Sequence, residues 1–340
     1  MNKWIFTGIS GSGRIEFLED IKKELKRKKK NVMIYDLGNI IRQVCAKNKI
    51  KVEDDSILDL DLNTLSLARS LAISEINSEI LKNSNIEFHL IGVHLTFRWK
   101  QRLIPGFTIN EILSLKPDGF INVINNVTDI YQTNKKNPKW KSVKLPDLLE
   151  TQYWLMEEEF ITEMLADMTN APIYLVSSQH NISNLSDLMC TNKKKIYLSY
   201  PITAIEKSNP QLLKKIQGPI LDQLEKIFIV FNPLSIEDMK LTNSIPNVSK
   251  LTKKGIDIIK SRTVQRDYQF IDQSDAVVVI YMTEKLSPGV MSEIIYANRN
   301  GKPVYMLFPF KASPFLSDAT KIIVPSFEEL FVHLEEFAQK

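Results

Sequence analysis

The sequence predicts an α/β protein built from two parallel-sheet domains, each with three layers. The chain has 340 residues, which exceeds the usual length of one domain. Short apolar segments alternate twice with longer segments of helical periodicity, and this alternation is typical of parallel sheets covered by helices. A polar stretch at residues 177–195 separates the two series and ends in three lysines. We therefore expect one domain at residues 1–190 and a second at residues 195–340.

The composition is that of an ordinary globular protein, with 44% hydrophobic and 25% charged residues. No apolar run reaches the roughly 18 residues that a membrane span needs, and the N-terminus lacks the apolar core of a signal peptide. The cysteines, Cys45 and Cys190, are far apart and lack metal-ligand spacing. These observations predict a cytoplasmic protein with no metal centre and no membrane partner. The lysine runs at residues 26–30 and 193–195 predict solvated lysines rather than a nucleic-acid site.

The first domain begins with a glycine-rich loop. Residues 3–7 form an apolar strand, the loop follows directly, and residues 15–29 have the pattern of a charged helix. A strand, a glycine loop and a helix in this order place backbone N–H groups around a phosphate at a helix N-terminus. The spacing Gly-x-x-x-x-Gly fits such a loop. The candidate nucleotide-binding residues are Gly8, Gly11, Gly13 and Arg14.

Two positions at the end of this loop depart from the usual pattern. Arg14 stands where such loops have Lys, so the positive charge is kept on a side chain of different shape. Ile15 stands where a Ser or Thr holds magnesium, and its side chain cannot coordinate a metal. The pattern therefore predicts the fold better than it predicts catalysis, and an empty structural turn is the alternative.

The rest of the first domain continues the alternation. A second strand at residues 31–35 ends at Asp36, and residues 62–83 have apolar side chains at helical spacing. The remaining expected elements are strands at 86–93, 119–125 and 173–176 and helices at 109–115 and 145–168.

This order of features resembles the archaeal-type adenylate kinases among the P-loop kinases. The resemblance covers about residues 3–190. It rests on the glycine loop, the segment Ile104-Pro105-Gly106, the strand entry Pro117-Asp118 and the closing helix and strand.

Three departures from that family bear on activity. The family has an acid and a His just after the third strand; His94 fits the His, and Gly92 stands at the acid's place. The segment corresponding to the lid, residues 129–140, contains no arginine, and Ile15 replaces the magnesium ligand. Phosphoryl transfer depends on magnesium and on cations around the phosphate. We therefore expect a degenerate domain that acts as a nucleotide sensor or scaffold rather than as a kinase.

The second domain repeats the alternation of strands and helices. The expected strands are at residues 196–200, 227–231, 276–281, 304–308 and 322–324. The expected helices are at residues 211–226, 254–270 and 327–338, with a short helical run at 294–298. The polar segment 235–253 is a candidate active-site loop.

Two acids stand out in the second domain. Asp267 precedes the apolar strand at residues 276–281. Glu293 follows that strand and a Ser287-Pro288-Gly289 turn, and it opens the helical run. Two carboxylates at the carboxyl end of a parallel strand can attack and protonate a glycosidic bond.

This region resembles the nucleoside 2-deoxyribosyltransferase superfamily over about residues 195–310. The matching features are Asp267 before the run 271–279, the pattern Ser287-x-Gly289-x-x-x-Glu293, the pair Tyr296-Ala297, the segment 301–304 and Tyr197 on the first strand. Ser287, six residues before the Glu, is closer to the branch that hydrolyses 2'-deoxynucleoside 5'-monophosphates.

The resemblance implies a Rossmann-like deoxyribosyltransferase fold and a retaining mechanism. Glu293 would attack the anomeric carbon and form a glycosyl ester. Asp267 would protonate or orient the leaving base, and Tyr197 would hold Glu293 by a hydrogen bond. In the alternative interpretation the three residues have structural roles only. Glu293 would then be an acid at a helix start, Asp267 a surface acid beside Arg266, and Tyr197 a core tyrosine.

The predicted substrate-binding residues surround this pair. Ser287 and Gly289, at a helix N-terminus, would bind a 5'-phosphate. Ser199 and Pro201, at the end of the first strand, complete the set. Thr203 stands near the place of an arginine that monophosphate hydrolases carry, so the phosphate assignment is weaker than the carboxylate pair. Ser287 as a simple turn residue is the alternative.

The leading hypothesis from the sequence is hydrolysis of the N-glycosidic bond of a (deoxy)nucleoside 5'-monophosphate or related nucleotide, without a cofactor. Base exchange between deoxynucleosides is a close alternative. A nucleotide-sensing effector that degrades nucleotides or NAD and a nucleoside monophosphate kinase are two others. The resemblance also implies that a neighbouring subunit completes the site, so we expect a homodimer or a larger assembly.

Overall fold

The computed structural model describes residues 2–52, 56–141, 143–235 and 252–339, and the chain divides into two compact units. Unit 1 holds Met1–Gln179 with Asp238–Lys260, and unit 2 holds His180–Glu237 with Ser261–Lys340. Of the candidate active-site loop at residues 235–253, positions 236–251 lie outside the described residues.

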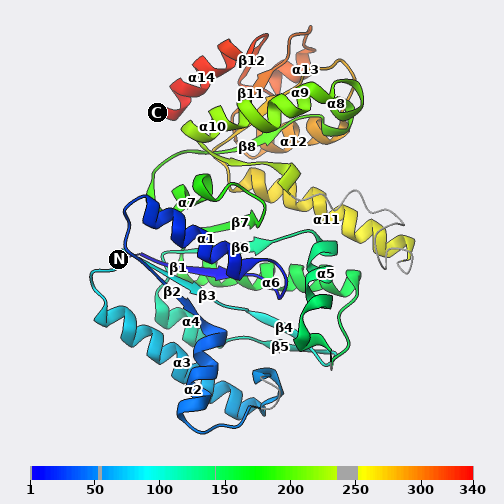
Figure 1. Cartoon of the computed structure of the whole chain (residues 1–340). Coiled ribbons are helices and arrows are strands. Elements are labelled where there is room, and N and C mark those ends of the chain that lie inside the picture. Colours follow the sequence, from blue (N-terminus) through cyan, green and yellow to red (C-terminus); the bar gives the residue numbers. More distant parts are fainter. Residues whose placement is uncertain (1, 53–55, 142, 236–251, 340) are drawn as a thin grey trace. The chain divides into compact units, whose positions relative to one another are not determined.

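Unit 1 is organised around a parallel five-stranded sheet with the order β2-β3-β1-β6-β7 (Figure 1). Its strands are β1 (Asn2–Thr7), β2 (Val32–Asp36), β3 (Phe88–Gly92), β6 (Gly119–Ile124) and β7 (Ile173–Ser177). The central strand β1 is apolar, with Ile5 and Phe6 fully buried, as expected for a strand covered on both faces.

Six complete helices belong to the described part of unit 1, together with residues 253–260 of helix α11 (Lys253–Asp272). The complete helices are α1 (Arg14–Arg27), α2 (Leu37–Lys47), α3 (Leu62–Lys82), α4 (Ile109–Leu115), α5 (Val127–Lys136) and α6 (Leu148–Thr169). An antiparallel hairpin, β4 (Thr96–Trp99) with β5 (Arg102–Pro105), and the short 3-10 turns η2 (Ile57–Asp59) and η3 (Pro138–Trp140) complete the unit. The sequence did not predict α2, α5 or the hairpin.

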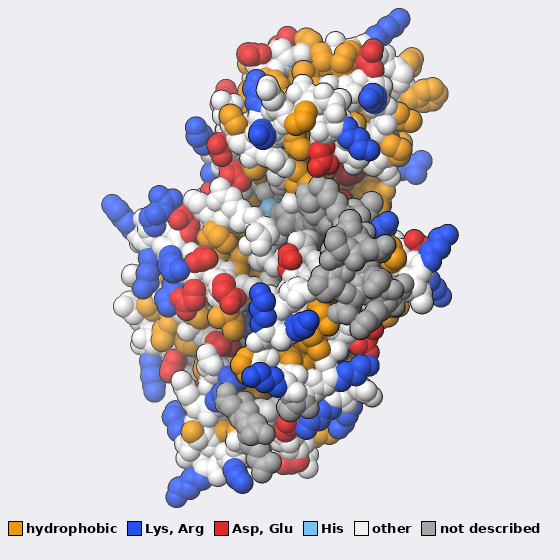
Figure 2. Space-filling model, turned by 45° about the vertical axis from the view of Figure 1, so that its right-hand side comes forward, with side chains coloured by type: hydrophobic (Ala, Val, Ile, Leu, Met, Phe, Trp, Pro, Cys, Tyr) orange, Lys and Arg blue, Asp and Glu red, His pale blue; other side chains and the backbone are white. Residues whose placement is uncertain are grey.

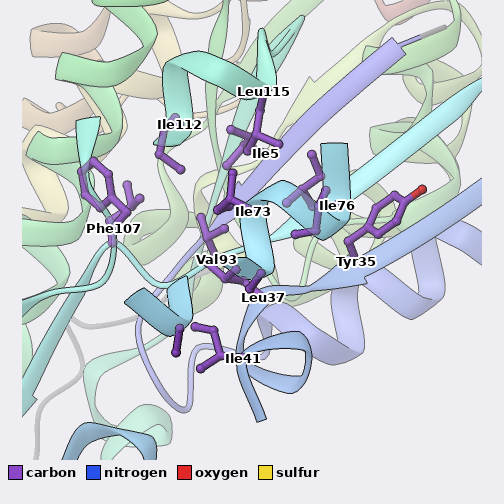
Figure 3. Close-up of a cluster of buried hydrophobic side chains, with 14 of the residues drawn as sticks. Ile5, Tyr35, Leu37, Ile41, Ile73, Ile76, Val93, Phe107, Ile112 and Leu115 are labelled. Atoms are coloured by element: carbon purple, nitrogen blue, oxygen red, sulfur yellow. The ribbon is translucent and has the colours of Figure 1, made fainter. Parts of the chain in front are cut away.

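The core beside β1 joins strands to helices that are distant in sequence. Figure 3 shows Ile5 of β1 and Tyr35 of β2 among Ile73 and Ile76 of α3 and Leu115 of α4, and all of them are buried. Burying these side chains holds β1 and β2 in place, and the glycine loop and Asp36 follow directly at the ends of those strands.

Unit 2 is built on a second parallel five-stranded sheet with the order β12-β11-β10-β8-β9. Its strands are β8 (Lys195–Ser199), β9 (Ile229–Phe231), β10 (Ala276–Ile280), β11 (Val304–Leu307) and β12 (Ile322–Val324). Strand β10 is entirely buried, which explains its continuous run of apolar residues. The predicted α/β class with two parallel sheets is confirmed.

The helices of unit 2 begin with α7 (Ile182–Cys190), which falls in this unit rather than in the first. The others are α8 (Ile202–Ser208), α9 (Pro210–Lys215), α10 (Leu221–Ile227), α12 (Pro288–Arg299), α13 (Pro314–Asp318) and α14 (Phe327–Gln339), and residues 261–272 of helix α11 (Lys253–Asp272) also belong to unit 2. The helix expected at residues 211–226 is interrupted by a π-turn, Ile216–Ile220, that contains Pro219. Proline has no N–H for a regular helical hydrogen bond, which accounts for the irregular turn.

The helix that carries Glu293 starts earlier than expected. Ser287 is the N-cap and Pro288 the first helical residue of α12, so the Ser287-Pro288-Gly289 segment is a helix start rather than a separate turn. Ser at the N-cap followed by Pro is a common helix start, because Pro lacks only an N–H that would have no helical acceptor. Glu293 consequently lies in the second turn of α12 and does not open the helix.

Two surface observations complete the description. No helix among the described residues is long and apolar enough to cross a membrane. On the face shown in Figure 2, Lys and Arg side chains are interspersed with acidic, apolar and neutral ones.

Candidate functional sites

The glycine loop of unit 1 connects β1 to α1, and its three glycines, Gly8, Gly11 and Gly13, have a positive φ that other residues rarely adopt. Gly11 has φ 83° and Gly13, the N-cap of α1, has φ 86°. A Cβ at Gly11 would lie 2.9 Å from the carbonyl oxygen of Ile130. The loop therefore needs glycine for both conformation and space, and it leads into first-turn amides of α1 that lack intrahelical acceptors.

Two buried polar side chains, which the sequence did not single out, hold this loop. Glu158 of α6 accepts hydrogen bonds from the amides of Gly8 (3.1 Å), Leu95 (2.9 Å) and Thr96 (2.7 Å). Asn134 of α5 accepts from the Ser10 hydroxyl and donates to the Ser10 carbonyl, both at 2.8 Å. The carboxylate of Glu158 thus joins the loop to the β4 hairpin. In the sequence Glu158 is the middle acid of the run 157–159, and only the structure shows that it is buried.

Arg14 lies beneath the loop and contacts His94. Its side chain is 3% exposed, and Nη2 lies 3.1 Å from Nε2 of His94. His94 Nδ1 donates to the carbonyl of Gly8 at 2.6 Å, so Nε2 carries no proton and accepts from Arg14. Burial and the charge of Arg14 hold the pKa of His94 well below its usual value, so this histidine is neutral. Among the described residues, Arg14 Nε and Nη1 have no hydrogen-bond partner.

Gly92 makes room for that guanidinium. A Cβ at this position would lie 2.5 Å from Arg14 Nη1 and 2.8 Å from Leu18 Cδ1. The guanidinium therefore takes the space where the kinase resemblance places an acid. Burial lowers the pKa of Arg14, while the nearby charges of Asp36 and Glu158 oppose that effect. The two differences from the kinase pattern thus depend on each other, because the side chain of Arg14 needs the space that Gly92 leaves free.

A cavity of about 490 Å³ opens beside the loop. Its walls include Ser10, Gly11 and Arg14 from the loop region, Asp36 and Arg42 at α2, and the aromatic rings of Phe97, Trp99, Trp140 and Trp154. Ile15 also faces it and is 50% exposed, so this position offers methyl groups and no oxygen to a metal ion. Within the described residues there is no group of three or more His, Cys, Asp or Glu side chains that could hold a metal.

In unit 2, Glu293 is held by two hydroxyl groups from strand β8. Tyr197 Oη donates to Oε1 at 3.0 Å, and Ser199 Oγ donates to Oε2 at 2.5 Å. Both donors are fully buried. Tyr197 and Ser199 are two residues apart on one strand, so their side chains lie on the same face of the sheet. The arrangement fixes both oxygens of the carboxylate.

Asp267 approaches the same site from α11. Its Oδ1 accepts from Arg266 Nη2 at 3.0 Å, and the Arg266 side chain is buried. Its charge acts on Glu293 and on Tyr197, so the predicted catalytic residues Glu293, Asp267 and Tyr197 lie together. Arg266 orients Asp267, a contribution for which adjacency along the chain was the only signal.

Burial and mutual repulsion control the protonation of these carboxyl groups. Burial, followed by the charge of Asp267, raises the pKa of Glu293 to about 8, although the bonds from Ser199 and Tyr197 act in the opposite direction. Burial also raises the pKa of Asp267, and the Arg266 ion pair partly offsets the increase. Two nearby half-buried carboxyl groups with raised pKa values can share one proton near neutral pH.

The predicted phosphate-binding residues occupy the start of α12. The Ser287 side chain makes no capping hydrogen bond, and a Cβ at Gly289 would meet nothing within 4 Å. The Ser287 amide donates to Tyr281 Oη at 2.7 Å, so this N–H is already used. The hydroxyl of Ser287 and the amide of Gly289 are the groups there that suit a phosphate. Pro201 is buried directly after β8, and Thr203 is exposed on α8.

The sequence did not predict a series of hydrogen bonds between polar groups at the end of β9. Tyr200 Oη donates to Asn232 Oδ1 at 3.0 Å, and the Asn232 amide donates to His180 Nε2 at 3.3 Å. Burial lowers the pKa of His180 to about 3, so it is neutral and acts as an acceptor. An Asn after a strand carried no signal in the sequence that separated it from an ordinary turn residue.

Comparison with known proteins bears on unit 1. Residues 7–139 match the family model of an AAA domain, a segment that runs from the end of β1 into η3 and includes the glycine loop, Arg14 and His94. No curated protein matches the chain. The match, the parallel sheet and the loop geometry support similarity of unit 1 to nucleotide-binding P-loop domains. The match does not extend to unit 2, where the deoxyribosyltransferase resemblance stays a prediction.

Proposed function

We propose that unit 2 hydrolyses the N-glycosidic bond of a (deoxy)nucleoside 5'-monophosphate or related nucleotide through a covalent ester on Glu293. The observation that carries this proposal is the fixed carboxylate of Glu293, held through both oxygens by Tyr197 and Ser199 with Asp267 close by. A carboxylate with both oxygens fixed needs little reorganisation before it attacks. The second carboxyl group supplies the proton that the leaving base needs.

In the first step, an oxygen of ionised Glu293 forms a bond to the anomeric carbon as the bond from carbon to the base nitrogen breaks. The electron pair of the broken bond goes to the base, which takes a proton from Asp267. The raised pKa of Asp267 favours its acid form, and protonation of Asp267 removes the negative charge that repels ionised Glu293. The reaction starts from the singly protonated pair when its proton lies on Asp267 and Glu293 is ionised, whereas burial favours the proton on Glu293 near neutral pH.

In the second step, water attacks the anomeric carbon and the ester bond to Glu293 breaks. Asp267, now ionised, takes a proton from the water, which returns the pair to its starting state and releases the sugar phosphate. If a second base attacks in place of water, the product is a new nucleoside, or a new nucleoside 5'-monophosphate when the sugar carries a phosphate. Hydrolysis and base exchange thus share the same residues and differ in the acceptor.

The proposal is tested by chromatography of products from a panel of nucleosides, 5'-monophosphates and NAD. We expect free base from the wild type and none above the uncatalysed level from Glu293→Gln. Asp267→Asn should lower the rate by about 10²–10⁴-fold, the usual contribution of a general acid. Glu284→Gln, at an exposed acid of the same unit, is the control and should retain wild-type activity.

The products formed from the substrate panel distinguish the proposed activity from the alternatives. Release of base by Glu293→Gln at the wild-type rate contradicts the proposal. A new nucleoside on addition of a second base supports base exchange, and ADP formed from ATP with a monophosphate acceptor supports kinase activity in unit 1. No free base from any substrate, with a folded wild-type protein, rejects the hydrolase assignment.

A further inference from the structure

The cavity of unit 1 has two chemically different ends, and the reaction proposed for unit 2 uses neither. One end is formed by the glycine loop and cationic side chains, the other by tryptophan rings. Its volume of about 490 Å³ falls within the usual size range of small-molecule sites, which is about 300–1,000 Å³.

The cationic end contains a buried charge that lacks a counter-ion contact. Arg14 is 3% exposed and lines the cavity, and within the described structure its Nε and Nη1 have no hydrogen-bond acceptor. The buried hydroxyl of Ser12 in the same loop also has no partner there. A buried guanidinium with unused donors is costly unless an anion approaches it. Arg42 of α2 adds a second guanidinium to the cavity wall.

The same end lacks the hydroxyl group that usually binds magnesium, although the carboxylates of Glu16 and Asp36 also line the cavity. Ile15 lines the cavity at the position where a phosphate-binding loop provides a hydroxyl for magnesium. A triphosphate brings several negative charges that a metal usually neutralises. With guanidinium groups in place of a metal ligand, the loop is suited to a ligand that carries a single phosphate.

The aromatic end is formed by tryptophan rings that pack against one another. Trp99 and Trp140 contact edge to face with ring centroids 5.4 Å apart, and Trp140 contacts Trp154 at 6.1 Å. Trp99 is fixed because its Nε1 donates to Asp59 at 2.8 Å. All three rings line the cavity. Such rings bind the π-face of a planar heterocycle, and this contact depends little on which base is present.

We propose that this cavity binds a nucleoside monophosphate without magnesium, with the phosphate at Arg14 and the glycine loop and the base against Trp99 and Trp140. Every tryptophan of the chain belongs to unit 1, and three of the four line the cavity. Tryptophan emission therefore reports on this site and not on the carboxylate site of unit 2. The proposal does not depend on the activity proposed for unit 2.

The test is a titration of tryptophan emission in the full chain carrying Glu293→Gln, which prevents turnover of the added nucleotide. AMP and CMP are added in EDTA and in magnesium, and ATP with magnesium, adenosine and inorganic phosphate are added separately. We expect AMP and CMP to quench the emission, with dissociation constants that agree within about threefold with and without magnesium. ATP with magnesium, adenosine and phosphate should each bind at least about tenfold more weakly, a factor equal to about 1.4 kcal/mol.

Three variants locate the site. Arg42→Gln should weaken AMP about tenfold, and Trp99→Leu should do the same because base stacking is lost. Arg102→Gln, at an exposed arginine of β5 away from the cavity wall, should bind AMP like the parent. Circular dichroism confirms that each variant is folded, and Arg42→Gln, which is only half-buried, keeps the test decisive if Trp99→Leu unfolds.

Three kinds of result would overturn the inference. The first is quenching that requires magnesium or that is stronger with ATP and magnesium than with AMP. The second is an unchanged emission up to millimolar AMP and CMP, and the third is an equal loss of AMP affinity in Arg42→Gln and Arg102→Gln.

Discussion

The glycine loop differs from the usual phosphate-binding loop through Arg14, which lies against two other residues, Gly92 and His94. Arg14 keeps the positive charge that a phosphate-binding loop requires, but its larger head group lies over Gly92 and against His94. His94 is fixed as a neutral acceptor by its bond to Gly8. A lysine has no planar head group to occupy that space. The three positions are therefore expected to respond to substitution as a group.

The first prediction concerns Gly92→Ala. The added methyl group would lie 2.5 Å from Arg14 Nη1 and 2.8 Å from Leu18 Cδ1, so the guanidinium and the leucine must move. We expect the free energy of unfolding to fall by about 1–3 kcal/mol, as in other overpacked cores. Urea unfolding followed by tryptophan emission measures it.

Gly38→Ala is the matched control, because a Cβ there would meet its nearest atom at an ordinary 3.6 Å. The cost of Gly92→Ala should shrink when Arg14→Lys is also present, since the shorter head group leaves the space free. An equal cost in both backgrounds would mean that Arg14 is not the reason for the glycine.

The second prediction concerns the stability cost of Glu293. Its pKa rises from the ordinary glutamate value of 4.5 to about 8 in the folded protein, so the folded state binds more protons than the unfolded state between these values. The stability associated with protonated Glu293 is complete below about pH 4.5 and is lost as the pH rises through about 8. Glu293→Gln cannot ionise and avoids this loss. Relative to the wild type, it should gain on the order of 4 kcal/mol between pH 5 and pH 9.

Urea midpoints at pH 5 and pH 9 test this expectation. The exposed control Glu284→Gln should follow the wild type at both values. If Glu293→Gln loses stability relative to the wild type as the pH rises, the carboxylate is stabilised by its two hydroxyl donors more than it is destabilised by burial.

At the scale of elements, the sequence predicted what its local patterns specify. Helix α4 was predicted at its observed bounds, and the structure shows a capping box of Thr108 and Glu111 at its start. Strand β10 was predicted because it is a continuous apolar run, and the glycine loop because of its spacing. These features depend on short-range chemistry that is visible in a single sequence.

The elements that were missed depend on distant partners. Helix α5 has a polar sequence, and its role depends on Asn134, which bonds to Ser10 more than a hundred positions away. Glu158 binds three amides from two other segments. A single sequence gives no indication of such pairings. For the same reason the contact of Glu293 with Tyr197 came from a family resemblance, while Ser199 was placed near the substrate and not on the carboxylate.

The third prediction concerns the start of α12. The Ser287 side chain makes no capping bond, so Ser287→Ala should change the free energy of unfolding by less than about 0.5 kcal/mol. Ser326 at the start of α14 accepts from the Glu329 amide, and Ser326→Ala should cost about 1 kcal/mol. In the product assay, Ser287→Ala should raise the KM for a 5'-monophosphate and leave that for the matching nucleoside unchanged. An equal change in both KM values would remove Ser287 from the phosphate assignment.

At the scale of the whole molecule, the two units have separate cores. One cluster packs β1, β2 and β3 with α2 and α3, and the other packs β8, β9, β10 and β11 with α10 and α14. Each sheet is complete within its own unit. A unit with its own sheet and core can fold alone in principle, so we expect two unfolding transitions rather than one.

The distribution of tryptophan makes this fourth prediction testable without dividing the chain. Because all four tryptophans lie in unit 1, emission follows that unit alone, whereas far-ultraviolet circular dichroism follows the helices and strands of both. The dichroism transition that emission does not detect belongs to unit 2. At pH 9, Glu293→Gln should shift this transition to a higher urea concentration and leave the emission midpoint of unit 1 unchanged. Gly92→Ala should do the reverse, lowering the emission midpoint and leaving the other transition in place. If either variant shifts both transitions together, the two units unfold as one cooperative block, and the stability of each site then depends on the other unit.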